Sequence, residues 1–187
     1  NTLPINAAAR LFSPSLGPDV DAAAGKLRFR AIVFVGLKIR RKKILPASFV
    51  YFREHSFNRV TDMSYFKFKM DPPDSTLLVA EIACDPADAV WSDDALAREA
   101  ALADLVRENL ITREEVLDSV VFRTANGHPM YTLGYEDALK TLLGAVEGLS
   151  NAVTAGRQGR FAYVNTHVAM KMGREAADRL HDKALKP

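Results

Sequence analysis

The sequence contains little of what disulfides, metal sites and membrane spans require. Its 187 residues include one cysteine, Cys84, and four histidines that lie far apart. A single cysteine excludes a disulfide within the chain and is typical of a reducing compartment, so we expect a cytoplasmic protein. Separated histidines offer no metal-ligand spacing. No apolar run approaches the roughly 18 residues that suggest a transmembrane helix, so neither a metal nor a membrane span is expected.

Sequence motifs that bind nucleotides or carry out catalysis are also absent. No Gly-x-Gly-x-x-Gly fingerprint occurs, and the pairs Gly144/Gly148 and Gly156/Gly159 have the wrong spacing. No Walker loop, nucleophile elbow or Ser-His-Asp arrangement can be argued either. The residues therefore identify no catalytic group, and the chain lacks the element that usually holds the ADP half of a dinucleotide.

Charge of one sign does not dominate the chain. Its 25 basic and 23 acidic residues leave a net charge of +2, which is too mild to indicate a nucleic-acid partner. The exception is a short, dense basic cluster. We interpret it as a solvated strand end or turn rather than a phosphate or lipid site. Its members are Lys38, Arg40, Arg41, Lys42 and Lys43.

Hydrophobic patterning predicts an α+β fold with a mainly antiparallel sheet flanked by helices. Apolar residues make up 48% of the chain, which is enough for a core in one domain. A short strand is expected at 2–5, Ser92 is expected to begin a helix, and Thr112 to Glu115 form a capping box. The longer strands are expected at 27–39, 49–53, 57–62, 77–84 and 117–123, and the longer helices at 93–108 and 135–149.

A stretch near the C-terminus, 156–177, combines a glycine turn with a helix start. Gly156 and Gly159 bracket Arg157, and Asn165 or Thr166 can cap the helix that follows. A helix start presents free N–H groups and the positive end of a dipole, which suits an anionic or electron-rich ligand. Small residues leave one side of that helix open to close approach by another helix or by a flat cofactor.

This stretch resembles the C-terminal flavin-binding segment of the FAD-dependent amine oxidase superfamily, in particular its protoporphyrinogen oxidase-like and UDP-galactopyranose mutase-like members. Further motifs of the superfamily occur in order along the chain, at 27–31, 49–60 and 127–131. In the last of these, His128 stands where tyrosine is commoner. The matching residues of the C-terminal segment are Gly156, Arg157, Gly159, Phe161, Tyr163 and Asn165.

The resemblance implies a flavoenzyme that binds FAD non-covalently and takes a hydride from a bulky, flat small-molecule substrate. It implies a substrate-binding-domain segment at 1–150 and a C-terminal FAD-domain segment at 151–187. The cofactor-binding candidates that it gives are Gly156, Arg157, Asn165, Thr166, His167 and Val168. The substrate-binding candidates are Tyr51, Arg59, Tyr131 and Tyr163.

The chain begins Asn-Thr-Leu-Pro-Ile-Asn, without a methionine. We therefore expect an excised C-terminal part of a longer polypeptide, inactive alone, whose partner is a missing N-terminal Rossmann-type FAD domain. The surface left uncovered then favours a homodimer.

Two alternatives remain at this point. One is a fragment of a mutase-like flavoprotein that acts on a nucleotide sugar, for which Arg28, Arg30, Arg53 and Arg59 are available. The other is a non-catalytic binding domain that kept the fold.

Overall fold

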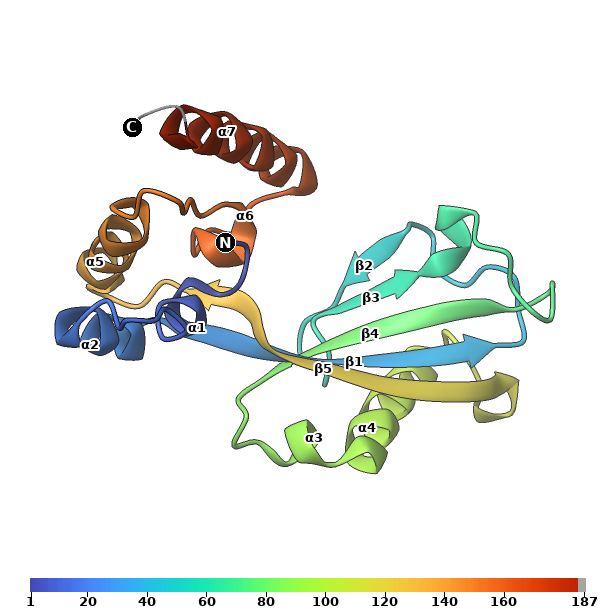
Figure 1. Cartoon of the computed structure of the whole chain (residues 1–187). Coiled ribbons are helices and arrows are strands. Elements are labelled where there is room, and N and C mark those ends of the chain that lie inside the picture. The colour runs from blue at the N-terminus through green and yellow to red at the C-terminus, as the bar shows by residue number, and fades with distance from the viewer. Residues whose placement is uncertain (185–187) are drawn as a thin grey trace. The chain divides into compact units, whose positions relative to one another are not determined.

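The computed structural model describes residues 1–184, and Figure 1 shows its helices and strands. Contacts between residues divide the chain into two compact units. Asn1–Phe29 and His128–Pro187 make up the first, which we call the helical unit. Arg30–Gly127 make up the second, which we call the sheet unit. Each unit has its own hydrophobic core.

The sheet unit is built on a five-stranded sheet in which the strand order is β2-β3-β4-β1-β5. Strand β4 runs antiparallel to both β1 and β3, and β3 runs antiparallel to β2. β-Branched and aromatic residues are frequent in these segments, which favours extended backbone. The strands are β1 (Arg28–Ile39), β2 (Phe49–Tyr51), β3 (Arg59–Asp62), β4 (Thr76–Cys84) and β5 (Val116–Met130).

Helices α3 (Ala89–Ser92) and α4 (Asp94–Arg107) lie on one side of this sheet (Figure 1). Since side chains alternate along a strand, every second residue of β1 from Ala31 to Ile39 enters the core on that side. The same core takes in the buried, free thiol of Cys84. From α4 it receives Ala97, Ala101 and Leu105, all fully buried.

The helical unit packs its short helices around a separate core. Helix α5 contributes Ala138, Leu142 and Val146, which recur at helical spacing and are buried. Phe161, far along the chain, is buried in the same cluster and meets Phe29 edge to face with ring centroids 4.9 Å apart. The helices are α1 (Ile5–Ala8), α2 (Pro18–Lys26), α5 (Tyr135–Glu147), α6 (Gly156–Gly159) and α7 (Thr166–Ala184).

The predicted α+β class and antiparallel sheet are confirmed, and so is the capping box at Thr112, which opens the 3-10 helix η2 (Arg113–Glu115). The strand expected at 2–5 is wrong, because Pro4 begins a single helical turn there. The cap expected at Ser92 is also wrong. Asp93 begins α4, and its carboxylate accepts hydrogen bonds from the backbone of Ala95 and Leu96.

Strand β5 continues seven residues beyond the end expected at 123, to Met130. Its late part contains Gly127, a residue that usually weakens strands. A Cβ added to Gly127 would lie 2.5 Å from the Ile32 side chain. The glycine therefore permits a close approach of β5 to β1, which the sequence pattern alone does not reveal.

The fully buried carboxylate of Asp62 joins three segments of the sheet unit. It accepts hydrogen bonds from the backbone N–H groups of Ile44, Leu45 and Ser64, at 2.9, 3.1 and 3.0 Å, and from the Thr76 hydroxyl at 2.8 Å. Burial alone would raise its pKa, but the hydrogen bonds donated to the charged form outweigh burial and hold the pKa below its ordinary value.

We expect Asp62→Ala to destabilise the chain at neutral pH, because each buried donor left without an acceptor costs about 1–3 kcal/mol. A carboxyl whose pKa is depressed by folding stabilises the native state above its unfolded pKa, and that stabilisation is lost as pH falls through the folded pKa. Urea unfolding should therefore show a difference between parent and variant that narrows below about pH 4.

The matched control is Asp74→Ala, since Asp74 is exposed in the turn before β4. It should change the free energy of unfolding by less than about 0.5 kcal/mol. An equal effect of both substitutions, or a difference that does not depend on pH, would contradict the role of Asp62.

Candidate functional site

The loop between α5 and α7 carries most of the residues that the sequence analysis selected in the helical unit. Within this loop, α6 forms one short helical turn. Its first residue, Gly156, has φ +78°, in the left-handed region that favours glycine. Phe161 then takes φ +49°, also left-handed, with its ring fully buried. A non-glycine residue accepts this conformation where packing fixes it, so the core of the helical unit sets the path of the loop.

Arg157 is held in place by the loop itself. Its Nη2 donates to the Val164 carbonyl at 3.1 Å, and its guanidinium carbon lies 4.2 Å from the centre of the Tyr163 ring. Its Nη1 lies 3.5 Å from Nδ1 of His128. The cation is thus oriented by a carbonyl, an aromatic face and a histidine before any ligand binds.

Aromatic rings surround this arginine. The Tyr131 hydroxyl accepts a hydrogen bond from the Tyr163 backbone at 2.7 Å, which ties the end of β5 to the loop. Tyr163 also meets His128 with ring centroids 5.1 Å apart. Tyr131 and Tyr163 are each 53% exposed, so their rings are anchored on one side and open on the other. Flat, apolar ligand surfaces fit such half-exposed rings.

The start of α7 follows directly. Asn165, Thr166 and His167 are exposed, and Val168 is half-buried. The first turn of this helix contains no acidic residue, so its free N–H groups and positive dipole end are not neutralised from within. Arg157 belongs to the loop that leads into this helix. Its guanidinium and the first N–H groups of α7 are all donors, so they favour an anionic or electron-rich group.

Asn1 holds the start of the loop between α5 and α7 through backbone hydrogen bonds. Asn1 donates from its terminal amine to the Val153 carbonyl at 2.6 Å, and its own carbonyl accepts from the Ala155 N–H at 2.9 Å. Thr154 donates its hydroxyl to the Gly159 carbonyl at 2.7 Å. There is no space for a side chain at Gly159, because a Cβ would lie 2.6 Å from the Thr154 oxygen and 2.9 Å from the Asn1 carbonyl.

The sheet unit presents a second set of candidate residues, on the sheet face opposite α4. Arg59 there donates from Nε to Glu81 on the neighbouring strand at 2.8 Å. Its guanidinium carbon lies 5.5 Å from the Phe49 ring centre and 5.8 Å from that of Tyr51. Phe122, on the edge strand β5, is 65% exposed. No helix among the described residues of the sheet unit is packed on this face, which we call the open face.

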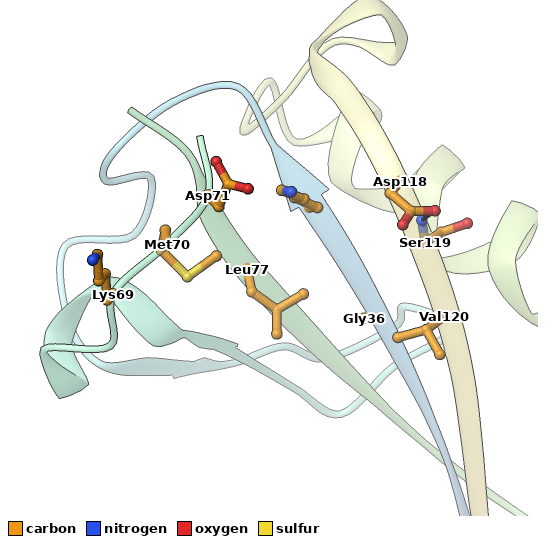
Figure 2. A pocket seen from close by; sticks show the side chains of 9 residues that line it. Gly36, Lys69, Met70, Asp71, Leu77, Asp118, Ser119 and Val120 are labelled. Carbon is orange, nitrogen blue, oxygen red and sulfur yellow. Dashed lines mark hydrogen bonds between the residues drawn. The ribbon is translucent and has the colours of Figure 1, made fainter. Parts of the chain in front are cut away.

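A pocket of about 250 Å³ lies where the open face meets the loop after η1 (Met63–Phe66). Figure 2 shows Leu77 and Met70 on its apolar side and Asp118 with Ser119 across from them. Gly36 forms part of the wall, and a Cβ there would come within 3.0 Å of Val120. Its lining residues are Gly36, Lys38, Lys69, Met70, Asp71, Leu77, Asp118, Ser119 and Val120.

The predicted residues therefore form two groups, one in each unit. In the helical unit Tyr163 contacts both Arg157 and Tyr131, and Gly156 and the start of α7 belong to the same stretch of chain. Tyr51 and Arg59 contact each other in the sheet unit.

The sequence analysis missed the role of His128 and Glu81 as partners of the two arginines. The alternation of β4 could have placed Glu81 on the face away from the core, where Arg59 of the neighbouring strand also lies. No local signal pairs His128 with Arg157, because 29 residues separate them.

Among residues 1–184, no three His, Cys, Asp or Glu side chains are grouped so that they could hold a metal ion. In the same described part, no helix is both long and apolar enough to cross a membrane.

No protein-family model and no curated protein matches the sequence. The fold, however, is similar to solved structures. Reduced UDP-galactopyranose mutase aligns at a TM-score of 0.80 and 20% identity, over 97% of this chain and 40% of that one. A protoporphyrinogen oxidase-like protein from Exiguobacterium aligns at 0.67 and 17% identity, over 98% and 40%. A putrescine oxidase variant with redesigned cofactor binding aligns at 0.64 and 18% identity, over 97% and 42%.

The chain spans about two fifths of the length of these proteins. They carry the names of the groups that the sequence motifs resemble, so the resemblance is confirmed for the fold. At identities of 17–20%, the likeness establishes the fold and no further property.

Gly159→Ala tests whether the Arg157 loop depends on the contact beneath it. Because the added methyl overlaps Thr154 and the Asn1 carbonyl, we expect a loss of about 1–3 kcal/mol in the free energy of unfolding. Faster amide exchange should accompany it at 153–164. Gly144→Ala is the control, since nothing lies within 4 Å of its Cβ position inside α5. It should be neutral or stabilising by about 0.5–1 kcal/mol, and destabilisation by both would refute the interpretation.

Proposed function

We propose that this chain forms the C-terminal part of an FAD-dependent oxidoreductase of the protoporphyrinogen oxidase or amine oxidase type, and that it is inactive alone. The observation that carries the proposal is the position of Arg157. It lies in the motif order that the superfamily uses at its flavin, and Val164, Tyr163 and His128 orient it beside a helix start that lacks acidic residues.

The residues present fit a flavin in chemical terms. Arg157 and the first N–H groups of α7 supply cationic and neutral donors for the electron-rich edge or the pyrophosphate of FAD. We assign Gly156, Asn165, Thr166, His167 and Val168 to the same contact surface. A bound flavin would supply the hydride-accepting chemistry. The chain's own share is to bind, orient and shield, because the described residues include no group placed as a catalytic acid or base.

The substrate side of the proposal rests on half-exposed aromatic rings. Tyr131 and Tyr163 offer flat surfaces next to Arg157, and Tyr51 offers one on the open face beside Arg59. Such walls suit a bulky, flat small molecule more than a compact polar one. The ion pair between Arg59 and Glu81 leaves that wall nearly neutral.

The mutase-like alternative requires arginines aimed at a diphosphate. One of its candidates already has a carboxylate partner, since Arg59 pairs with Glu81 at 2.5 Å. A cation with a carboxylate partner attracts a phosphate less. The oxidoreductase is therefore the better supported proposal, although the mutase has the highest TM-score of the three proteins compared. The third possibility, a non-catalytic binding domain, is decided by the flavin experiment below.

In the longer protein, we assign 1–150 to the substrate-binding domain and 151–187 to the FAD domain. The two compact units follow other limits, because Phe161 packs with α2 and α5. The assignment therefore says which segment would contact the substrate and which the FAD in the longer protein. It does not describe the two compact units of this chain. The partner that we propose is a Rossmann-type FAD domain encoded upstream, and the compartment is the cytoplasm.

The coding sequence upstream of Asn1 provides the first test, since it should contain a Gly-x-Gly-x-x-Gly fingerprint. In the longer protein, Arg157→Ala should remove a charge-assisted contact worth about 1.5–3 kcal/mol, and thus weaken flavin binding roughly ten- to hundredfold. Flavin absorbance per polypeptide after gel filtration measures it. Arg113→Ala is the control, because Arg113 is an exposed arginine of the sheet unit paired with Glu99.

Equal flavin content in parent and Arg157→Ala would show that Arg157 is an ordinary surface arginine. Absence of flavin from the longer protein would favour the binding domain. The 187-residue chain itself should bind FAD weakly or not at all, since it lacks the dinucleotide fingerprint. A stoichiometric complex at micromolar FAD, detected by flavin fluorescence, would contradict this part.

The exposed side of α7 leads to one further expectation. Ala176 is buried against Val153 and Ala155, but Met170 and Leu180 are exposed. Without the proposed FAD domain we expect a homodimer that covers this side, or a helix with fast amide exchange. Light scattering with size exclusion, together with hydrogen exchange over 166–182, measures both. A strict monomer with a strongly protected α7 would refute the missing-partner proposal.

A further inference from the structure

Two segments of the sheet unit, 40–45 and 63–70, are joined to each other by direct contacts, and each carries exposed residues. The Lys43 ammonium lies 4.6 Å from the centre of the Tyr65 ring. The Tyr65 hydroxyl donates to the Leu45 carbonyl at 2.9 Å. Beneath them, the buried Asp62 carboxylate accepts from both segments, through the N–H groups of Leu45 and Ser64. A surface made from the two segments is therefore a fixed feature of this unit.

The second segment alternates aromatic and basic residues at its exposed end. Phe66 is 49% exposed and Phe68 is 60% exposed, and the lysines beside them, Lys67 and Lys69, are exposed as well. Lys67 adopts φ +56°, which turns the chain between the two phenylalanines. Neither ring belongs to the core of the sheet unit. Two large apolar side chains two positions apart are thus about half exposed outside the core, and such neighbouring exposed rings can form an interaction surface.

Both segments are rich in basic residues. Segment 38–45 contains five basic residues and segment 63–70 contains two, and neither contains an acidic one. Of these, Arg41 is paired with Glu115 at 3.0 Å. Asp71 and Asp74 follow only after the second segment. The two segments themselves are thus strongly positive, although the chain as a whole carries only +2 and Asp71 and Asp118 lie near Lys69. We call Arg40, Lys42, Lys43, Phe66, Lys67, Phe68 and Lys69 the basic–aromatic rim.

We propose that the basic–aromatic rim binds the surface of a lipid bilayer that contains anionic lipids. Phe66 and Phe68 would enter the interface between headgroups and acyl chains, where aromatic side chains are favoured. The lysines and Arg40 would contact lipid phosphates and the negative surface potential. This binding is peripheral and involves no spanning helix. It does not depend on the flavoenzyme proposal, because it uses residues of the sheet unit alone.

The geometry favours a lipid surface over a soluble anion or an acidic protein. A soluble phosphate requires a pocket with converging donors, and the lysines of the rim are exposed and alternate with exposed rings along the chain. The nearby pocket that contains Lys69 also contains Asp71 and Asp118, which disfavour an anion there (Figure 2). An acidic protein surface would satisfy the lysines but would leave Phe66 and Phe68 facing polar groups. A bilayer interface satisfies both kinds of side chain at once.

The test is co-sedimentation of the 187-residue chain with vesicles of phosphatidylcholine alone and of phosphatidylcholine with about one quarter phosphatidylserine. We expect binding to the second kind only, weakening as salt rises through about 0.1–0.5 M because the electrostatic part is screened. The double variant Phe66→Ser/Phe68→Ser and the double variant Lys67→Glu/Lys69→Glu should each weaken binding at least about tenfold. Circular dichroism verifies that each variant is folded.

Two matched variants serve as controls. Phe122→Ser removes an aromatic ring that is 65% exposed but lies on β5, and Lys140→Glu reverses an exposed charge on α5. Neither should change vesicle binding more than about twofold. The proposal is overturned if the folded chain does not bind anionic vesicles, or if the control variants weaken binding as much as the rim variants. It is also overturned if inorganic phosphate at matched ionic strength displaces the chain from the vesicles. The proposal is also overturned if the lysine variant loses vesicle binding while the phenylalanine variant keeps it. That result would favour an acidic protein surface as the partner.

Discussion

The sheet unit depends on the fact that its own helices cover one face of the sheet. Along β1, alternate side chains fill the core against α4, and strand geometry then forces the residues between them onto the open face. Phe34, Arg59 and Glu81 share that face through the antiparallel register of β1, β3 and β4. The same constraint therefore builds the core and presents the candidate substrate surface, and a register shift by one residue would exchange the two.

The elements with a strong period could be predicted from the sequence. The apolar run of β1 and the helical face of α5 are visible in the residues themselves, and the structure has both. The strand expected at 2–5 is wrong because Pro4 caps the helical turn of α1, and backbone pairing with 153–155 is made by Asn1, just before that segment. Strand β5 exceeded its expected length because Gly127 fits against Ile32, and no local pattern encodes such a fit.

The candidate site divides in the same way. Arg157, Tyr163 and the start of α7 were accessible because they follow one another in a motif. Their contacts were not, since His128 and Tyr131 join the loop from the end of β5. The basic residues at 38–43 were interpreted as a solvated strand end or turn rather than a lipid site. Residues 40–43 are exposed as expected, and the proposed lipid binding replaces the second part of that interpretation. Only the fold brings Phe66 and Phe68 beside them, through the fixed position of Tyr65 next to Lys43.

The bond from the amine of Asn1 to the Val153 carbonyl bears on how the polypeptide can be lengthened. The amine donates to this carbonyl, and a peptide nitrogen at the same position would still carry one N–H that can donate. An amide in place of the ammonium would remove a charge from the exposed end and keep the pairing with 153–155. Residues joined ahead of Asn1 would thus continue an existing line of backbone bonds, and the Arg157 loop would retain its support.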